Sequence, residues 1–235
     1  MLYCTAELRS VTASFRNPDF QNFHKSFALP PPTALAGLAG AALGLSPKAA
    51  QAFLADAAFN IGVTGSSQGM VRDLWKYATL PGRSVITREV YIHNRFYVAF
   101  GSDNHAAVEQ LFSAFRSPIY ALTLGQSDSL AKVSNLQLTD QVGQSSTLSH
   151  TLVEGDVVPL ILEQALLGGR FSLTISQNDP VAYNLPTRFL YESDYGVRRV
   201  VARKLFSFVG PAVTFQNRTF TGVRLNDVFI PTFSF

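Results

Sequence analysis

The sequence predicts an α+β fold, with a ferredoxin-like domain over residues 1–140 and a β-rich region over residues 141–235. Two observations lead to this prediction. Strand-like and helix-like segments follow one another in the order βαββαβ up to about Leu138, the order used by RRM-like modules. After a polar, turn-like stretch at 141–149, strand-like runs separated by turn residues dominate. The length of 235 residues suits one large domain or a domain with an elaborated second half.

The elements of the first half follow from hydrophobic periodicity and from helix start and stop signals. The expected order is a strand over 2–15, a loop over 16–28, helices over 33–43 and 46–57, strands over 59–64 and 89–100, a helix over 103–116 and a strand over 131–138. Pro32 suits the first turn of a helix, where the missing N–H has no use. Gly44 suits a helix end, and Ser46 and Asn104 suit N-caps.

The first helix carries glycines at Gly37, Gly40 and Gly44, which fall with Ala41 on nearly one face. An interior glycine costs about 1 kcal/mol against alanine, so this face needs a reason. A face without side chains lets another backbone come close. Tight packing of the helix on the sheet and contact with RNA or another subunit remain open as alternatives.

Residues 64–88 predict a long excursion between two strands, in the form of a hairpin-like protrusion. Turn-rich segments bracket a run that mixes cations with aromatic rings. The alternatives are a surface that contacts RNA, because bases stack on rings while cations follow phosphates, and an ordinary solvated loop. The residues concerned are Arg72, Trp75, Lys76, Tyr77, Arg83 and Arg88.

The second half is expected to consist mainly of strands. They are placed at 157–165 (strand or short helix), 171–175, 188–192, 198–209 and 219–230, with turns at 168–169, 178–180 and 210–211. Arg198, Arg199, Arg203 and Lys204 form the densest basic cluster of the chain. On a strand these side chains divide between the two faces, so they do not form one basic stripe.

The composition limits the possible classes of function. The chain is 47% hydrophobic and 15% charged with a net charge of +3, which permits nucleic-acid binding and indicates a surface partly covered by partners. Cys4 is the single cysteine, which suits a reducing cytoplasm and a buried position. Residues 1–15 lack the pattern of a signal peptide, and the apolar run 34–45 is too short to span a membrane.

Two places could carry chemistry. Gly125, Gln126 and Ser127 form a small polar loop whose backbone N–H groups can bind a phosphate. His24 and Lys25 could cleave RNA without a metal, if the histidine moved protons while the lysine stabilised charge. The four histidines lack metal-ligand spacing and no nucleotide-binding motif occurs, so neither a metal nor a cofactor is expected.

Several blocks resemble the N-terminal signature of the Cas5 family, in the RAMP superfamily. These proteins are RNA-binding subunits of type I CRISPR surveillance complexes, known as Cascade. The matching blocks are Ser14-Phe15-Arg16, 29–33, 37–44 and, in 120–130, Tyr120, Leu122, Leu124, Gly125, Ser127 and Leu130. In the second half the resemblance depends mainly on 185–188 and the basic strand after it.

The resemblance implies a non-enzymatic subunit that holds the 5′ handle of a CRISPR RNA. It would sit between the backbone subunits and the large subunit and reach target DNA only through the complex, and 64–88 would be the family's thumb-like insertion. The implied and candidate RNA contacts are Ser14, Arg16, Asn17, His24, Lys25, Arg72, Trp75, Lys76, Arg83, Arg88, Gly125, Gln126, Ser127 and Arg188. Two alternatives stay open: a metal-independent CRISPR endoribonuclease using His24 and Lys25, and a protein-interaction scaffold without RNA contact.

Overall fold

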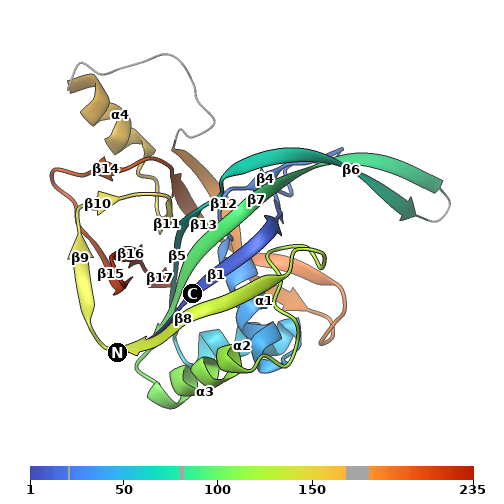
Figure 1. Ribbon diagram of the computed structural model, residues 1–235, viewed down its shortest axis with the longest axis horizontal. Coiled ribbons are helices and arrows are strands. Elements are labelled where there is room, and N and C mark those ends of the chain that lie inside the picture. Colours follow the sequence, from blue (N-terminus) through green and yellow to red (C-terminus); the bar gives the residue numbers. More distant parts are fainter. Residues whose placement is uncertain (21, 80–81, 168–179) are drawn as a thin grey trace.

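The structure is a computed structural model that describes residues 1–20, 22–79, 82–167 and 180–235. It confirms a strand-rich α+β fold, built around one long sheet with helices at two ends of the molecule (Figure 1). The helices are α1 (Pro32–Leu43), α2 (Pro47–Asp56), α3 (His105–Arg116) and α4 (Val158–Leu167). The strands of the long sheet, in spatial order, are β12 (Val181–Tyr191), β13 (Arg198–Val209), β11 (Thr151–Glu154), β5 (Asn60–Ser66), β7 (Gly82–Ser102), β1 (Leu2–Ala13) and β8 (Ala131–Thr139).

The strands of the first half are antiparallel in the order β8-β1-β7-β5. Side chains alternate between the two faces of β1, so Leu8 enters the core on the helix side while Glu7 and Arg9 face the other way. In the ladder, Leu8 lies opposite Phe96 and Arg9 lies opposite Arg95. The register therefore follows from burying one face of each strand.

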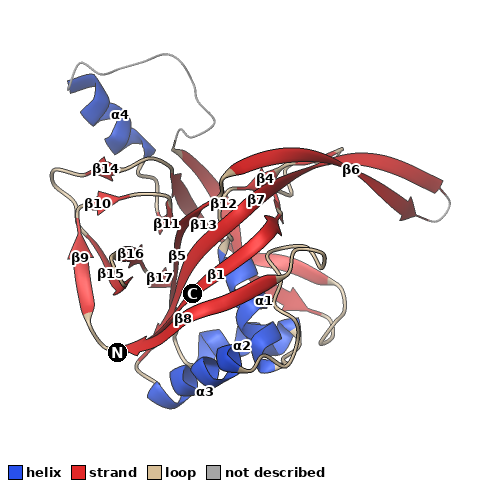
Figure 2. Cartoon of the chain, in the orientation of Figure 1, coloured by secondary structure: helices blue, strands red, loops and turns tan. Residues whose placement is uncertain are grey.

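Helices α1, α2 and α3 gather together against the sheet, and α4 lies at the far end of the molecule (Figure 2). The signals in the sequence fix their ends. Gly44 adopts a left-handed φ of 72° and ends α1. The side chains of Ser46 and Asn104 accept hydrogen bonds from the first turns of α2 and α3, as expected for N-caps.

The main core lies between these helices and the sheet. Leu8, Leu35 and Leu111 are fully buried, and the Phe100 and Phe115 rings lie 5.6 Å apart. Each such side chain contributes about 1.5–3 kcal/mol by leaving water. Cys4 is buried in the same core, as predicted.

The glycine face of α1 does not act as one surface. A Cβ at Gly40 would lie 2.6 Å from the Cβ of Ala50, so this glycine lets α2 approach α1. A Cβ at Gly44 would lie 2.7 Å from the side chain of Ile119, whereas Gly37 is exposed and a Cβ there would meet nothing within 4 Å. The close contact at Gly40 is thus helix on helix, and not the helix-on-sheet packing that we considered.

The protrusion predicted at 64–88 is a long antiparallel hairpin of β6 (Gly69–Thr79) and β7. It projects far from the body of the molecule (Figure 1). We call this projecting hairpin the arm. β7 is 21 residues long, so the strand expected at 89–100 is the inner part of a strand that begins in the arm. The arm and the core therefore share one continuous strand.

The second half extends the same sheet. β11 joins β5 at the pair Thr151–Thr64, and β13 and β12 follow it outward. The short C-terminal β17 (Phe233–Ser234) also pairs with β5. The long sheet therefore contains strands from both halves of the chain, although the chain leaves it for other sheets between β8 and β11.

A smaller sheet covers part of the face of the long sheet that is turned away from the helices. It consists of β9 (Val142–Ser145), β15 (Phe220–Leu225) and β16 (Val228–Pro231), and a two-stranded pair, β10 (Thr147–Leu148) and β14 (Val213–Thr214), lies beside it. Val223 and Ile230 pack against Tyr3 and Ala99 of the long sheet. The expectation of a turn-like stretch at 141–149 is wrong, because β15 supplies β9 with a ladder partner.

The segment 157–165, left open as strand or helix, is the helix α4. The expected strand 171–175 and turns at 168–169 and 178–179 lie outside the described residues. Within the described part of the chain, no helix has the length and hydropathy that crossing a membrane requires.

Candidate nucleic-acid interface

The segment 14–28 lies along the base of the hairpin. We expected a loop over 16–28, but it contains short strands: β2 (Phe15–Arg16) pairs with β4 (Ser26–Phe27), and β3 (Phe23–His24) pairs in parallel with β7. The backbone N–H of Asn17 donates to the carbonyl of Lys25 at 2.7 Å, which closes the turn between them. The pairing of β3 with β7 places the side chains of Phe23 and His24 beside those of β6.

Cations and aromatic rings meet there in a group that we call the hairpin-base cluster: Arg16, Phe23, His24, Arg72, Trp75 and Arg88. The Arg72 guanidinium lies 5.9 Å from the centroid of the Phe23 ring. The centroids of the His24 and Trp75 rings lie 5.6 Å apart in an edge-on arrangement, and the Arg88 guanidinium lies 5.3 Å from the centroid of the Trp75 ring. The structure therefore brings together two stretches that the sequence singled out separately.

Arg88 is the buried centre of this cluster, with 7% of its surface exposed. Its Nη2 donates to Asp73 at 2.8 Å and to Asp128 at 3.0 Å. Burial lowers the pKa of Arg88, but the hydrogen bonds and charges of Asp128 and Asp73 outweigh it and raise the pKa above its ordinary value. The guanidinium thus ties the hairpin to the loop that carries Gly125.

That loop comes very close to the end of β1. Gly125 has a φ of 94°, and a Cβ there would lie 1.9 Å from the carbonyl oxygen of Ser14. The backbone N–H of Ser14 donates to the Leu124 carbonyl at 3.1 Å. Gly125 and Ser127 are exposed, so the loop presents its outer edge beside the cluster.

Several predicted contacts are buried and support the site from within. Ser14 donates its hydroxyl to the Glu89 carbonyl at 2.8 Å, and Asn17 is 1% exposed. His24 is 5% exposed, and burial followed by the charges of Arg16 and Arg88 lowers its pKa, so it is neutral near pH 7. Among the described residues, no hydrogen-bond partner is found for His24 Nδ1, Asn17 Nδ2 or Arg88 Nε.

Other predicted contacts reach solvent. Arg16, Arg72, Lys76, Gly125 and Ser127 are exposed, while Gln126 and Lys25 are half-buried. The Lys25 ammonium lies 5.1 Å from the centroid of the Phe20 ring.

Arg83 and Arg188 lie apart from the cluster. The backbone of Arg83 pairs with Ala78 in the outer hairpin, and its side chain is outside the described set. Arg188 is exposed on β12, at a break in the register with β13. The basic cluster of β13 is partly engaged internally, since Arg203 donates to the Asn184 carbonyl and Lys204 pairs with Glu154 at 3.3 Å.

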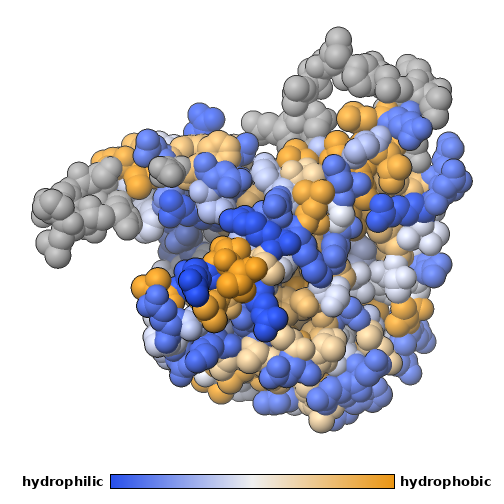
Figure 3. Space-filling model, turned by 180° about the vertical axis from the view of Figure 1, so that it is seen from behind, coloured by the Kyte–Doolittle hydropathy of each residue, from blue (hydrophilic) through white to orange (hydrophobic). Residues whose placement is uncertain are grey.

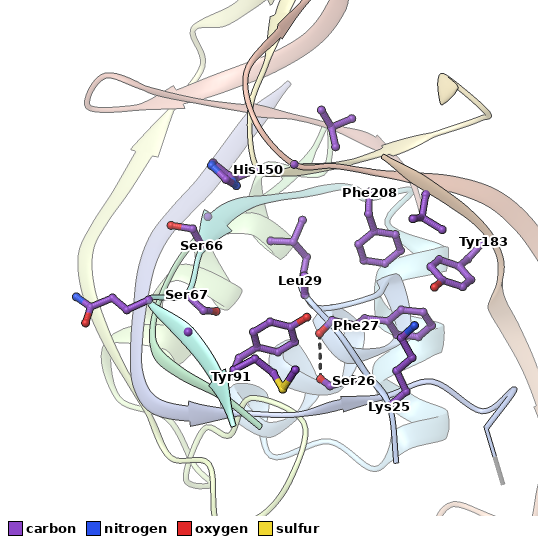
Figure 4. A pocket seen from close by; sticks show the side chains of 18 residues that line it. Lys25, Ser26, Phe27, Leu29, Ser66, Ser67, Tyr91, His150, Tyr183 and Phe208 are labelled. Carbon is purple, nitrogen blue, oxygen red and sulfur yellow. Dashed lines mark hydrogen bonds between the residues drawn. The ribbon is translucent and has the colours of Figure 1, made fainter. Parts of the chain in front are cut away.

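An aromatic cavity of about 410 Å³ adjoins the segment 25–29. Figure 4 shows Tyr91 and Phe208 on facing sides of it, with Phe27 and Tyr183 beside Phe208 and His150 at the rim. The Phe27 ring stacks on Phe208 at 5.3 Å. Burial raises the pKa of both tyrosines, and the charge of Glu89 adds to the effect. No local pattern in the sequence predicts this cavity, because its walls come from distant segments.

The outer surface is a mosaic of hydrophobic and hydrophilic side chains on the face shown in Figure 3. Metal binding has no support in the described ranges, where no group of three or more His, Cys, Asp or Glu side chains could hold an ion.

The fold and the site describe a strand-rich α+β protein whose projecting hairpin carries cations and aromatic rings at its base. The chain belongs to the family of CRISPR-associated proteins (Cas_Cas5), whose model matches residues 5–201. This confirms the family that the sequence blocks indicated.

Solved structures of CRISPR-related proteins are among those similar to this chain. A chain of a CRISPR RNA-guided surveillance complex is 12% identical with a TM-score of 0.58, over 90% of this chain and 91% of that one. A CRISPR protein from Archaeoglobus fulgidus is 12% identical with a TM-score of 0.48, over 98% and 99%. A crystal structure of a Cas protein is 19% identical with a TM-score of 0.37, over 53% of this chain and 57% of that one. No curated protein matches the chain.

Proposed function

We propose that this protein is a non-catalytic RNA-binding subunit of a type I CRISPR surveillance complex. It holds the 5′ handle of the guide RNA in the cytoplasm and joins the backbone subunits to the large subunit. The observation that carries the proposal is the hairpin-base cluster, where exposed cations lie beside aromatic rings on a chain of the Cas5 family.

The proposal includes a ferredoxin-like arrangement for the first half. Its support is the antiparallel order β8-β1-β7-β5, with α1 and α2 following the first strand and α3 preceding the last. In this arrangement the hairpin of β6 and β7 is the thumb-like insertion between the second and third strands.

Binding would use the exposed members of the site. Arg16, Arg72 and Lys76 suit phosphates, and the outer edge of the Gly125 loop offers backbone N–H groups to another. Proteins read single-stranded RNA by splaying bases out and stacking them on aromatic rings. The cavity beside Tyr91 has room for one such base.

The absence of catalysis is part of the proposal. His24, the histidine best placed to act on RNA, is almost fully buried against Trp75, and this burial, followed by the charges of Arg16 and Arg88, lowers its pKa. A 2′-hydroxyl would need to reach its ring for proton transfer, which requires hydrogen-bond distance. The burial therefore supports a structural role for His24.

The test is to incubate the purified protein with labelled repeat-spacer RNA in EDTA and to measure both binding and products. We expect intact RNA and an affinity that falls with salt. The double variant Arg72→Ala, Lys76→Ala should bind severalfold more weakly, with a salt slope reduced by about 0.7 for each lost phosphate contact. Lys48→Ala, which removes an exposed charge on α2, is the matched control.

The alternatives give different results in the same assay. Discrete cleavage in the repeat that His24→Ala abolishes would identify an endoribonuclease. RNA affinity and salt slope unchanged in the double variant would point to a protein-interaction scaffold.

A further inference from the structure

A row of three cations crosses the face of the sheet that is turned away from helices α1–α3. Arg95 on β7 lies opposite Arg9 on β1, and Arg9 lies opposite Lys132 on β8. These three strands are side by side in Figure 1. Neighbouring strands are about 4.8 Å apart, so the row spans about 10 Å. The Arg9 and Arg95 side chains are 57% and 53% exposed, and Lys132 is exposed as well.

A buried carboxylate holds two members of this row in place. Glu7 has no exposed side-chain surface, and the Nε atoms of Arg9 and Arg95 each donate to its Oε1 at 2.6 Å. Its Oε2 accepts a hydrogen bond from the side chain of Asn135. Burial raises the pKa of Glu7, but the hydrogen bonds from Arg9, Arg95 and Asn135 and the charge of Arg95 lower it overall. One negative charge thus opposes three positive charges, and the guanidinium groups are fixed in advance.

The row lies in a groove of about 600 Å³. Its walls include His93, Gln68 and Leu130, and the Arg95 guanidinium lies 5.4 Å from the centroid of the Tyr97 ring. The smaller sheet of β9, β15 and β16 covers the neighbouring part of the same face and leaves this part open.

The groove is continuous with the candidate RNA interface at two points. Gln68, in the turn before β6, lines both the groove and the aromatic cavity. Leu130 and Ala131 line the groove and also close the Gly125 loop, because Leu130 pairs with Thr123 and Ala131 donates to the Leu122 carbonyl. An RNA strand that leaves the Gly125 loop would meet the row of Arg9, Arg95 and Lys132 next.

We propose that this groove binds the phosphodiester backbone of the guide RNA where the single strand leaves the hairpin base. The inference rests on the proposed function. Guanidinium groups suit phosphate because their planar forks match its oxygens, and fixed ones lose less side-chain entropy on binding. The continuity with the interface favours an RNA strand over an acidic protein surface, which would need no path to the Gly125 loop.

The test uses Lys132, because removing either arginine would leave Glu7 buried with a lost partner. We expect Lys132→Ala to bind repeat-spacer RNA severalfold more weakly, with a salt slope smaller by about 0.7, and Lys132→Glu to bind more weakly still. Lys48→Ala should match the wild type. The RNA is then shortened from its 5′ end in one series and from its 3′ end in another. In one of the two series, we expect a length that the wild type still binds and that Lys132→Glu binds with the same affinity, because the nucleotides that contact the groove have been removed.

The outcomes separate this inference from the proposed function. If Arg72→Ala with Lys76→Ala weakens binding while Lys132→Glu does not, the groove proposal is overturned and the hairpin-base site stands. If the wild type does not bind the RNA, the proposed function fails as well. If Lys132→Glu instead abolishes capture of another subunit with RNA binding intact, the groove binds an acidic protein surface and the inference is wrong.

Discussion

Replacing Gly125 with alanine should destabilise the protein before it affects any ligand. A left-handed φ such as the 94° of Gly125 costs an ordinary residue about 1–2 kcal/mol. The new Cβ would lie 1.9 Å from the Ser14 carbonyl oxygen, so the two backbones must separate. Separation breaks the 3.1 Å bond from the Ser14 N–H to Leu124, which is worth about 1 kcal/mol. Together these effects predict a loss of about 2–3 kcal/mol.

The assay is thermal and urea unfolding of purified protein without RNA. A loss of about 2–3 kcal/mol lowers the melting temperature by roughly 4–12 °C in a chain of this size. Gly143→Ala on β9 is the control, because a Cβ there meets nothing within 4 Å. A Gly125→Ala variant as stable as the wild type would refute the reasoning and leave ligand contact as the reason for the glycine.

Three further predictions concern stability. Gly37→Ala should raise the melting temperature, since it gains about 0.5–1 kcal/mol in open space, whereas Gly40→Ala should lower it by a clash with α2; equal effects would contradict the contacts described. Arg88→Met should lower the free energy of unfolding in urea by about 1–3 kcal/mol, which is less than for a fully buried ion pair because the carboxylate partners of Arg88 are half exposed. A double-mutant cycle with Asp128→Asn should show coupling between the two residues, and its absence would argue against the ion pair. The pKa of Glu7 is lowered in the folded protein, so its contribution to stability is complete above the ordinary pKa of about 4.3 and is lost as the pH falls through the folded pKa. Glu7→Gln should therefore reduce the fall of the unfolding free energy at acid pH, and parallel pH curves for the variant and the wild type would contradict this prediction.

Local signals in the sequence were sufficient for most helices and for the hairpin. Proline, glycine and capping residues act within one turn, so the ends of α1, α2 and α3 could be placed to within a few residues. The strand β9 was missed because Gly143, Gln144 and Ser145 have little preference for a strand. Its partner, β15, lies about 75 residues further along the chain, and only the tertiary fold brings it near.

The candidate site could be predicted only in part, because the sequence shows local patterns and does not show contacts between distant segments. The mixture of Arg72, Trp75 and Lys76 is visible within one short stretch. The pairing of Arg88 with Asp73 and Asp128 needs two segments brought together, so the sequence alone presented Arg88 as a free cation. The row of Arg9, Arg95 and Lys132 was not noticed, although Glu7 and Arg9 in a mostly apolar strand were a signal that something polar lies on its outer face.

The length of β7 has a mechanical consequence. β7 runs as one strand from the outer hairpin through Val90 to the buried Phe100, with a left-handed φ of 51° at His93, so no linker separates the arm from the body. At about 3.3 Å per residue, the eight residues before Val90 carry the arm about 26 Å outward. A partner that binds the far end of this hairpin would therefore be held at a distance from the centre of the molecule that the length of β7 sets.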